Sequence, residues 1–192
     1  MRRKALIFLI AFSGIFLSGC GYNKMVDMEE QVESQWSQVE NVYQRRADLI
    51  PNLVNTVKGY AEHEQETLNS VIEARAKATS VNVNPENLNE QQIEQFNQAQ
   101  QGLSSALSRL MVVVERYPDL KANQNFRDLQ AQLESTENRI AVERRRFNEV
   151  TQTYNSYIRQ FPQVVYSGWI GFQKKDYFES QQGADQAPEV QF

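Results

Sequence analysis

Cysteine and histidine are almost absent from this chain, which contains one of each among its 192 residues. A single cysteine excludes an internal disulfide framework and a cysteine-rich zinc site, and a single histidine excludes a histidine cluster. We therefore expect neither a metal nor another cofactor. The composition, 41% hydrophobic and 23% charged, is too rich in apolar residues for a disordered tail and too polar for a protein with many membrane spans. The length fits one domain.

Basic residues are in the minority. The formal net charge is −4, and three of the bases, Arg2, Arg3 and Lys4, lie in an N-terminal leader without acids. Removing these three charges from −4 leaves −7 for the rest of the chain. Such a surface repels phosphate backbones, so the sequence argues against nucleic acid as a partner.

Glycine is also scarce, because only Gly59 and Gly102 occur between Tyr22 and Ser167. No alternation of apolar and polar residues, the pattern of a half-buried strand, persists for more than a few positions. The absence of both signals leaves helix, and we predict an all-α protein.

The N-terminal leader, residues 1–20, combines a basic start, an apolar run over residues 5–17 and small residues before Cys20. The run is short for a membrane span, which needs about 20 residues, and the whole pattern is that of a secretory signal. Leu17-Ser18-Gly19-Cys20 also resembles the bacterial lipobox, in which the cysteine takes a diacylglyceryl group and becomes the new N-terminus. The alternative is an uncleaved N-terminal anchor with a chance cysteine.

Both interpretations predict a domain that is held at a membrane by its N-terminus, on the extracytoplasmic side of the cell envelope. We assign lipid attachment to Cys20, since two or three acyl chains form a stable anchor at about 0.8 kcal/mol for each buried CH₂. Gly21, rather than Asp, follows the cysteine, which favours the outer membrane. The expected partners are the membrane and unidentified envelope proteins, and a homo-oligomer stays open.

The pattern of apolar residues in the rest of the chain predicts long amphipathic helices. Apolar residues recur in steps of three and four from Met25 to Ile72, so we favour one long helix bent at Pro51 over two helices joined by a tight turn. Residues 79–89 form a connection, and Asn89 caps a second helix that continues to Tyr117, where Pro118 stops it. Trp36 and Tyr43 lie on the apolar stripe and are predicted core residues.

A third long helix is predicted to start near Asn123 and to end before Pro162. It contains two rows of residues at seven-residue spacing, which predict near-antiparallel packing like that of a coiled coil. The first row is Phe126, Leu133, Ile140, Phe147, Tyr154 and Phe161, and the second is Leu129, Thr136, Glu143, Val150 and Tyr157. The aromatic segment 168–178 is expected to pack on the bundle, and residues 181–192 form a loose tail.

Several segments resemble the LemA family. They are residues 45–54 (RRADLIPNLV), 57–60 (VKGY), 63–64 (HE), 74–76 (ARA), 117–123 (YPDLKAN) with Phe126, 136–140 (TENRI), 154–155 (YN), 161–162 (FP), 171–172 (GF) and Phe192. The resemblance implies a membrane-anchored, extracytoplasmic, up-and-down bundle of three to four long helices over residues 21–180. It implies no activity, because the family has no established one. Many members keep an uncleaved N-terminal helix, whereas this chain has a lipobox.

An enzyme would have to use His63, the only imidazole, together with Glu64. A zinc protease helix needs a second histidine four residues on, which is missing, and a surface histidine is the simpler interpretation. We assign no catalytic residue. The first functional hypothesis is a helical scaffold or adaptor that works through protein contacts, and the alternative is an envelope hydrolase or ligand-binding domain centred on His63 and Glu64.

Charged residues in the two longest family-like segments form a candidate interaction patch. Counting helix lengths places the turn 118–122 level with residues 45–52, so that arginines of one segment meet charges of the other. Such Arg and Asp pairs either lock the bundle or receive a partner. The candidate residues are Arg45, Arg46, Asp48, Asn52, Pro118, Asp119, Lys121 and Asn123.

Overall fold

The computed structural model describes the backbone of residues 2–178 and the side chains of residues 21–178. This part of the chain contains helices and turns but no strand, which confirms the all-α prediction. The α-helices are α1 (Arg2–Lys58), α2 (Gln65–Ser80), α3 (Glu90–Val114), the short α4 (Pro118–Ala122) and α5 (Gln124–Ile158). Short 3₁₀ helices are η1 (Pro85–Asn87), η2 (Gln163–Val165) and η3 (Ser167–Ile170). The predicted loose tail, residues 181–192, and Phe192 lie outside the described residues.

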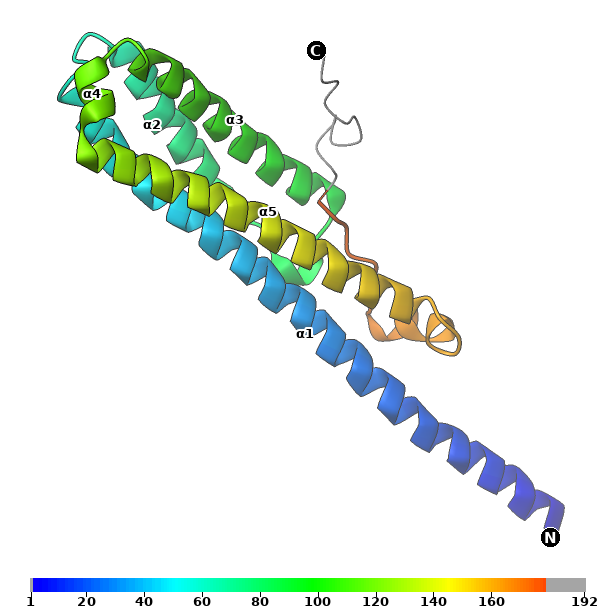
Figure 1. Cartoon of the computed structure of the whole chain (residues 1–192). Helices are drawn as coiled ribbons and strands as arrows, with labels where there is room; N and C mark the ends of the chain where they lie inside the picture. Colours follow the sequence, from blue (N-terminus) through cyan, green and yellow to red (C-terminus); the bar gives the residue numbers. More distant parts are fainter. Residues whose placement is uncertain (1, 179–192) are drawn as a thin grey trace, which may run out of the picture.

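The long helices alternate in direction and form an up-and-down bundle. Helices α1 and α5 run side by side in opposite directions, while α2 and α3 form a hairpin along the C-terminal part of α1 (Figure 1). The short α4 turns the chain from α3 into α5, and α1 continues past the other end of the bundle toward its N-terminus (Figure 1). Among the described residues, no helix offers a stretch that is both long and apolar enough to cross a membrane. The lipobox of residues 1–20 stays a prediction.

Helix α1 passes through Pro51 without a break, as predicted, but it ends at Lys58. The prediction that one helix continues to residue 78 is therefore wrong. The chain turns at Gly59, the residue type with the weakest helix propensity after proline, and the N–H groups of Tyr60 and Ala61 both bond to the carbonyl of Val57. Ala61 is buried inside this turn, which explains why the apolar spacing runs on across a change of helix.

Both predicted asparagine caps are confirmed. The side chain of Asn89 accepts a hydrogen bond from the N–H of Gln92 at 3.0 Å, and that of Asn123 accepts from the N–H of Phe126 at 3.0 Å. Helix α3 ends at Val114, and Pro118 is the first residue of α4, where its missing N–H has no helical partner to lose.

The core consists of two clusters of buried side chains. One surrounds Trp36, whose ring lies 5.3 to 5.5 Å from the rings of Phe96, Phe147 and Phe178. The other lies toward α4 and contains Leu53, Leu110, Leu120 and Phe126 among others. On α1 the first cluster ends at Tyr43 and the second begins at Ile50, so a boundary between them falls in the intervening residues.

The seven-residue row on α5 is confirmed over most of its length. Phe126, Leu133, Ile140, Phe147 and Tyr154 are buried, whereas the expected last member, Phe161, is 83% exposed. The row is wrong at Phe161 because α5 ends at Ile158, before the chain completes the next turn. The segment 168–178 packs on the bundle as predicted, through the buried Phe172 and Phe178.

Candidate functional site

A buried arginine lies at the boundary between the two core clusters. Arg46 of α1 is 1% exposed, and its guanidinium donates to Glu137 Oε1 at 2.7 Å, to Ser104 Oγ at 3.0 Å and to Gln100 Oε1 at 2.5 Å. Gln100 in turn donates through Nε2 to the carbonyl of Ala78 at 3.1 Å. One path of hydrogen bonds thus links α5, α1, α3 and α2, and we call these five residues the arginine network.

Tyr43 stands beside this network, one turn before Arg46. The Arg46 guanidinium lies 5.1 Å from the centre of the Tyr43 ring, an arrangement in which a cation is attracted to the ring face. Burial raises the pKa of Tyr43, against the opposing positive charges of Arg144 and Arg46, so the phenol stays neutral at physiological pH. Tyr43 therefore contributes a hydrogen-bonding group without adding a charge.

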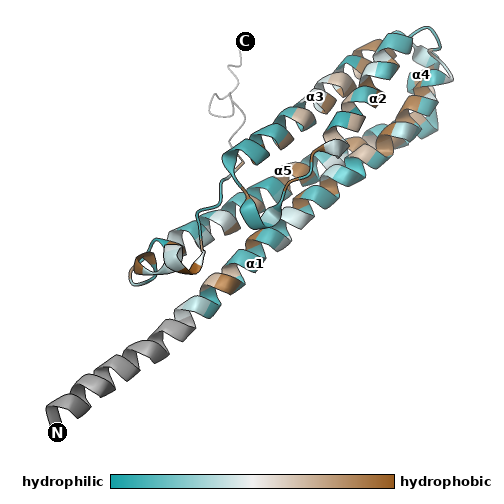
Figure 2. Cartoon of the chain, turned by 180° about the vertical axis from the view of Figure 1, so that it is seen from behind, coloured by the Kyte–Doolittle hydropathy of each residue, from teal (hydrophilic) through white to brown (hydrophobic). Residues whose placement is uncertain are grey.

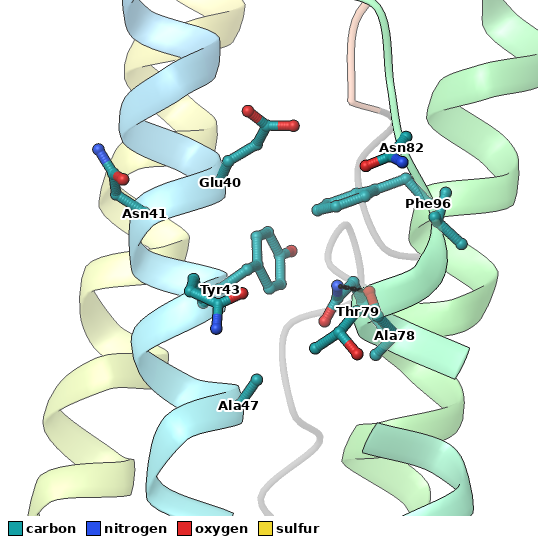
Figure 3. Close-up of a pocket in the computed structure, with 11 residues that line it drawn as sticks. Glu40, Asn41, Tyr43, Ala47, Ala78, Thr79, Asn82 and Phe96 are labelled. Atoms are coloured by element: carbon teal, nitrogen blue, oxygen red, sulfur yellow. Dashed lines mark hydrogen bonds between the residues drawn. The ribbon is translucent and has the colours of Figure 1, made fainter. Parts of the chain in front are cut away.

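Two small polar pockets lie on either side of Tyr43 and Gln100, which line both. The larger, of about 190 Å³, lies between α1 and the end of α2, and Figure 3 shows the Tyr43 ring pointing from α1 toward Phe96 across it. The smaller, of about 110 Å³, is also lined by Arg46, Glu137 and Arg144. Since a water occupies about 30 Å³ of liquid, both have room for a few waters or a small polar group.

The structure does not bring the predicted patch together. Arg46 is buried in the arginine network, Arg45 is exposed, and Asp48 accepts from Gln44 at 2.8 Å. At the other end, Asn123 donates to the hydroxyl of Tyr60 at 2.9 Å. The turn 118–122 is thus level with the α1–α2 turn rather than with residues 45–52.

The remaining patch residues also lie apart from Arg46. Asn52, Asp119 and Lys121 are exposed; the ammonium of Lys121 pairs with Glu115 at 2.5 Å, and Pro118 begins α4. The pairing of Arg45, Arg46 or Asp48 with Asp119 or Lys121 is therefore a wrong prediction of geometry. The counting failed because it treated residues 50–78 as one straight segment, whereas the chain reverses at Gly59. A docking role for the patch stays a prediction.

The candidate catalytic pair, His63 and Glu64, lies in the turn between α1 and α2. His63 is exposed, while Glu64 accepts from the guanidinium of Arg116 at 2.9 Å and from the hydroxyl of Tyr117 at 3.0 Å. The hydrogen bond that the Tyr117 hydroxyl donates to Glu64 is the main cause that raises the pKa of Tyr117. These contacts hold the α1–α2 turn against the end of α3. Among the described residues, no group of three or more His, Cys, Asp or Glu side chains is placed to hold a metal ion.

A buried lysine that the sequence pattern did not predict lies in the extended segment 172–178, which we call the strap. Lys175 is 3% exposed, and its Nζ lies 3.2 Å from Glu29 and 3.0 Å from Glu33 of α1. The same ammonium donates to the carbonyls of Pro85 and Glu86 in η1. The only signal in the sequence for a buried cation here was the spacing of Glu29 and Glu33, which lie one helical turn apart at the edge of the apolar stripe.

Two asparagines of α5, seven residues apart, hold the backbone of the strap. Asn148 exchanges two hydrogen bonds with the backbone of Phe178, at 2.8 and 2.9 Å, and Asn155 does the same with Lys175, at 2.7 and 3.0 Å. The Tyr154 hydroxyl donates to the carbonyl of Gln173 at 2.9 Å. Phe178 then stacks on Trp36 with ring planes 13° apart. The strap is thereby fixed by its backbone as well as by three buried side chains, those of Phe172, Lys175 and Phe178.

Together these features define the class of the protein: an all-α bundle in which one long N-terminal helix projects beyond the fold and buried polar groups lock the other helices onto it. The sequence matches the LemA family over residues 35–192, and the chain belongs to that family.

Curated relatives of this chain include proteins of two kinds. Magnetosome protein MamQ of Magnetospirillum gryphiswaldense is 28% identical over an alignment that covers 94% of this chain and 72% of that protein. Magnetosome protein MamQ 2 of Paramagnetospirillum magneticum is 27% identical, over 85% of this chain and 66% of that protein. Protein LemA of Metamycoplasma hominis is 23% identical, over 72% of this chain and 60% of that protein. The chain thus spans slightly less than two thirds of the length of MamQ 2.

Proposed function

We propose that this protein is a membrane-anchored helical scaffold that acts through protein contacts on the extracytoplasmic side of the cell envelope. The observation that carries the proposal is the continuity of α1. The helix that contains the leader backbone is the same helix that carries Arg46 and the core residues of the bundle. After cleavage before Cys20 the helix would keep residues 20–58, which extend about 59 Å at 1.5 Å per residue. An anchor on such a helix holds the bundle in one orientation relative to the membrane.

The contacts made by polar residues of the family-like segments support a scaffold role. Arg46 and Glu137 connect α1 with α5, and Glu64 connects the α1–α2 turn with Arg116 after α3. A rigid bundle of this kind is suited to present a surface. The relatives named as magnetosome proteins are in agreement, because their name refers to a cellular structure and not to a reaction.

A groove between α3 and α5 is the surface that fits a protein partner best. It has a volume of about 530 Å³ and apolar residues at its base, with polar residues along its rim. Leu107 and Leu133 are 8% and 7% exposed, and Met111 is half-buried beside them. A groove with apolar residues at its base, between two helices, suits the apolar face of a partner helix.

In-cell crosslinking tests the scaffold. We expect a photo-crosslinking residue at Ser108, on the rim of the groove, to capture one defined envelope protein, and the same residue at Glu73, exposed on α2, to capture none. Met111→Glu is expected to reduce the Ser108 adduct several-fold, because a carboxylate at the base of the groove disfavours an apolar helix face.

Three results would contradict the scaffold or its proposed groove. Equal capture from both positions would show that contact is unspecific, and unchanged capture in Met111→Glu would show that the groove is not the site. Turnover of a substrate by the purified chain, abolished by His63→Ala, would favour the hydrolase alternative instead.

A further inference from the structure

Exposed apolar side chains are concentrated in the loop that follows α5. Residues 159–171, which we call the apolar loop, include five large hydrophobic residues with exposed surfaces: Phe161 (83%), Val164 (52%), Val165 (56%), Trp169 (88%) and Ile170 (44%). They account for half of the ten exposed large hydrophobics among residues 21–178. Figure 2 shows hydrophobic colouring in this loop at the end of the bundle. Clusters of this kind mark a surface that is covered by something else.

The apolar loop packs against α1 directly after the leader. Tyr166 approaches α1 so closely that a Cβ added at Gly21 would lie 2.5 Å from the Tyr166 hydroxyl. The Tyr22 ring contacts Phe172 at 5.6 Å between centroids. In Figure 1 the loop lies beside α1 at the end of the bundle where α1 continues toward the N-terminus. The apolar loop is therefore level with Gly21, the residue after Cys20.

Under both interpretations of the leader, Gly21 lies at the membrane surface. A lipid on Cys20 places its acyl chains one residue from Gly21, and an uncleaved apolar run over residues 5–17 ends four residues before it. The rigid helix then carries the apolar loop to the same height. This step rests on the proposed membrane anchoring.

The composition of the apolar loop selects a lipid surface as its occupant. Residues 159–171 contain one base, Arg159, and no acid, although the chain as a whole is acidic. The loop thus avoids the repulsion that an acidic surface meets at anionic headgroups. Trp and Phe on an amphipathic surface suit the boundary between headgroups and acyl chains, where Trp buries its ring and keeps its N–H hydrated.

We propose that the apolar loop is a second membrane contact, which inserts Trp169 and Phe161 into the bilayer interface beside the N-terminal anchor. The loop adds a second point of attachment beside the N-terminal anchor. The end of the bundle that carries α4 then lies far from the membrane. The α3–α5 groove, which is near that end, also lies away from the membrane.

Tryptophan quenching tests this contact in the full chain, purified with its native anchor and reconstituted into vesicles of phosphatidylethanolamine and phosphatidylglycerol. The chain has two tryptophans, and Trp36 is completely buried, so an accessible quencher reports on Trp169. We expect bromine on the upper part of the acyl chains to quench Trp169 strongly and its emission to shift to the blue. Trp169→Phe is expected to lose most of this quenching.

A matched control moves the exposed tryptophan. Val112 on α3 is 72% exposed, and Val112→Trp in a Trp169→Phe background keeps one buried and one exposed tryptophan. We expect this variant to be quenched by acrylamide in water and not by brominated lipid. In addition, Phe161→Ser is expected to lower the lipid quenching of Trp169 severalfold, because the loop loses one of its two largest inserted groups.

The outcomes separate the two proposals. Protein that sediments with vesicles while Trp169 stays quenched by acrylamide alone would overturn the second contact and leave the anchor intact. Protein that does not sediment with vesicles would overturn both. Protection of Trp169 that requires high protein concentration, with no lipid quenching, would assign the apolar loop to a second copy of the chain and overturn the proposal.

Discussion

Arg46→Ala is expected to lower the free energy of unfolding by about 3 kcal/mol. The substitution removes a fully buried side chain and the three helix-bridging contacts that it makes to Glu137, Ser104 and Gln100. Large-to-small changes in a core leave a cavity, and a buried acceptor that loses its donor costs about 1 to 3 kcal/mol. Urea unfolding followed by circular dichroism measures the change.

Two further substitutions separate the contributions of packing and hydrogen bonding at Arg46 and provide a control. Arg46→Met fills most of the space without hydrogen bonding, so we expect a loss of about half that of Arg46→Ala. Arg45→Ala is the matched control, because Arg45 is the exposed neighbour on the same helix, and its effect is expected to stay within about 0.5 kcal/mol. Equal effects at residues 45 and 46 would mean that the arginine network does not hold the bundle together.

Lys175→Ala is expected to release the strap and to destabilise the protein by about 2 to 3 kcal/mol. The ammonium lies between Glu29 and Glu33, so its removal leaves two carboxylates close together without a cation. The carbonyls of Pro85 and Glu86 lose a donor at the same time. Because Phe178 stacks on Trp36, release of the strap also exposes that indole ring.

Fluorescence gives this prediction a local readout. In a Trp169→Phe background Trp36 is the only tryptophan, and its emission is expected to shift to the red in Lys175→Ala before the helices unfold. Lys174→Ala is the control, since the side chain of Lys174 is 56% exposed and pairs with Asp176 within the strap. If Lys174→Ala and Lys175→Ala give the same emission and the same stability, Lys175 does not hold the strap.

Local signals in the sequence predict most of the helices. Asn89 and Asn123 cap the helices that they were expected to cap, and the row from Phe126 to Tyr154 faces the core. Such features depend on residues within a few positions of each other, so they are visible without a fold. The end of α1 was missed although Gly59 marked it, because the burial of Ala61 keeps the apolar spacing in phase across the turn.

Contacts between distant residues account for what the sequence did not predict. Arg46 was identified as a candidate clamp, but its partner Glu137 lies 91 positions away. Lys175 and Asn155 have the sequence signature of solvated residues, and only the strap's path makes them buried partners. The predicted patch failed for a different reason: the chain reverses after α1, so residues 50–78 are not one straight segment and cannot be used to count levels along the bundle.

Fractionation of cells that produce the wild-type chain and its Cys20→Ser variant tests the membrane anchor, on which both proposals rest, most directly. We expect the wild-type protein to take a fatty-acid label and to stay in detergent-free membranes. The Cys20→Ser protein is expected to lose the label and to be released, because the apolar run of residues 5–17 is too short to span a membrane. Retention of unlabelled Cys20→Ser protein at the wild-type level would contradict lipid attachment and favour an uncleaved anchor. Wild-type protein that is recovered entirely in the soluble fraction would contradict membrane anchoring itself.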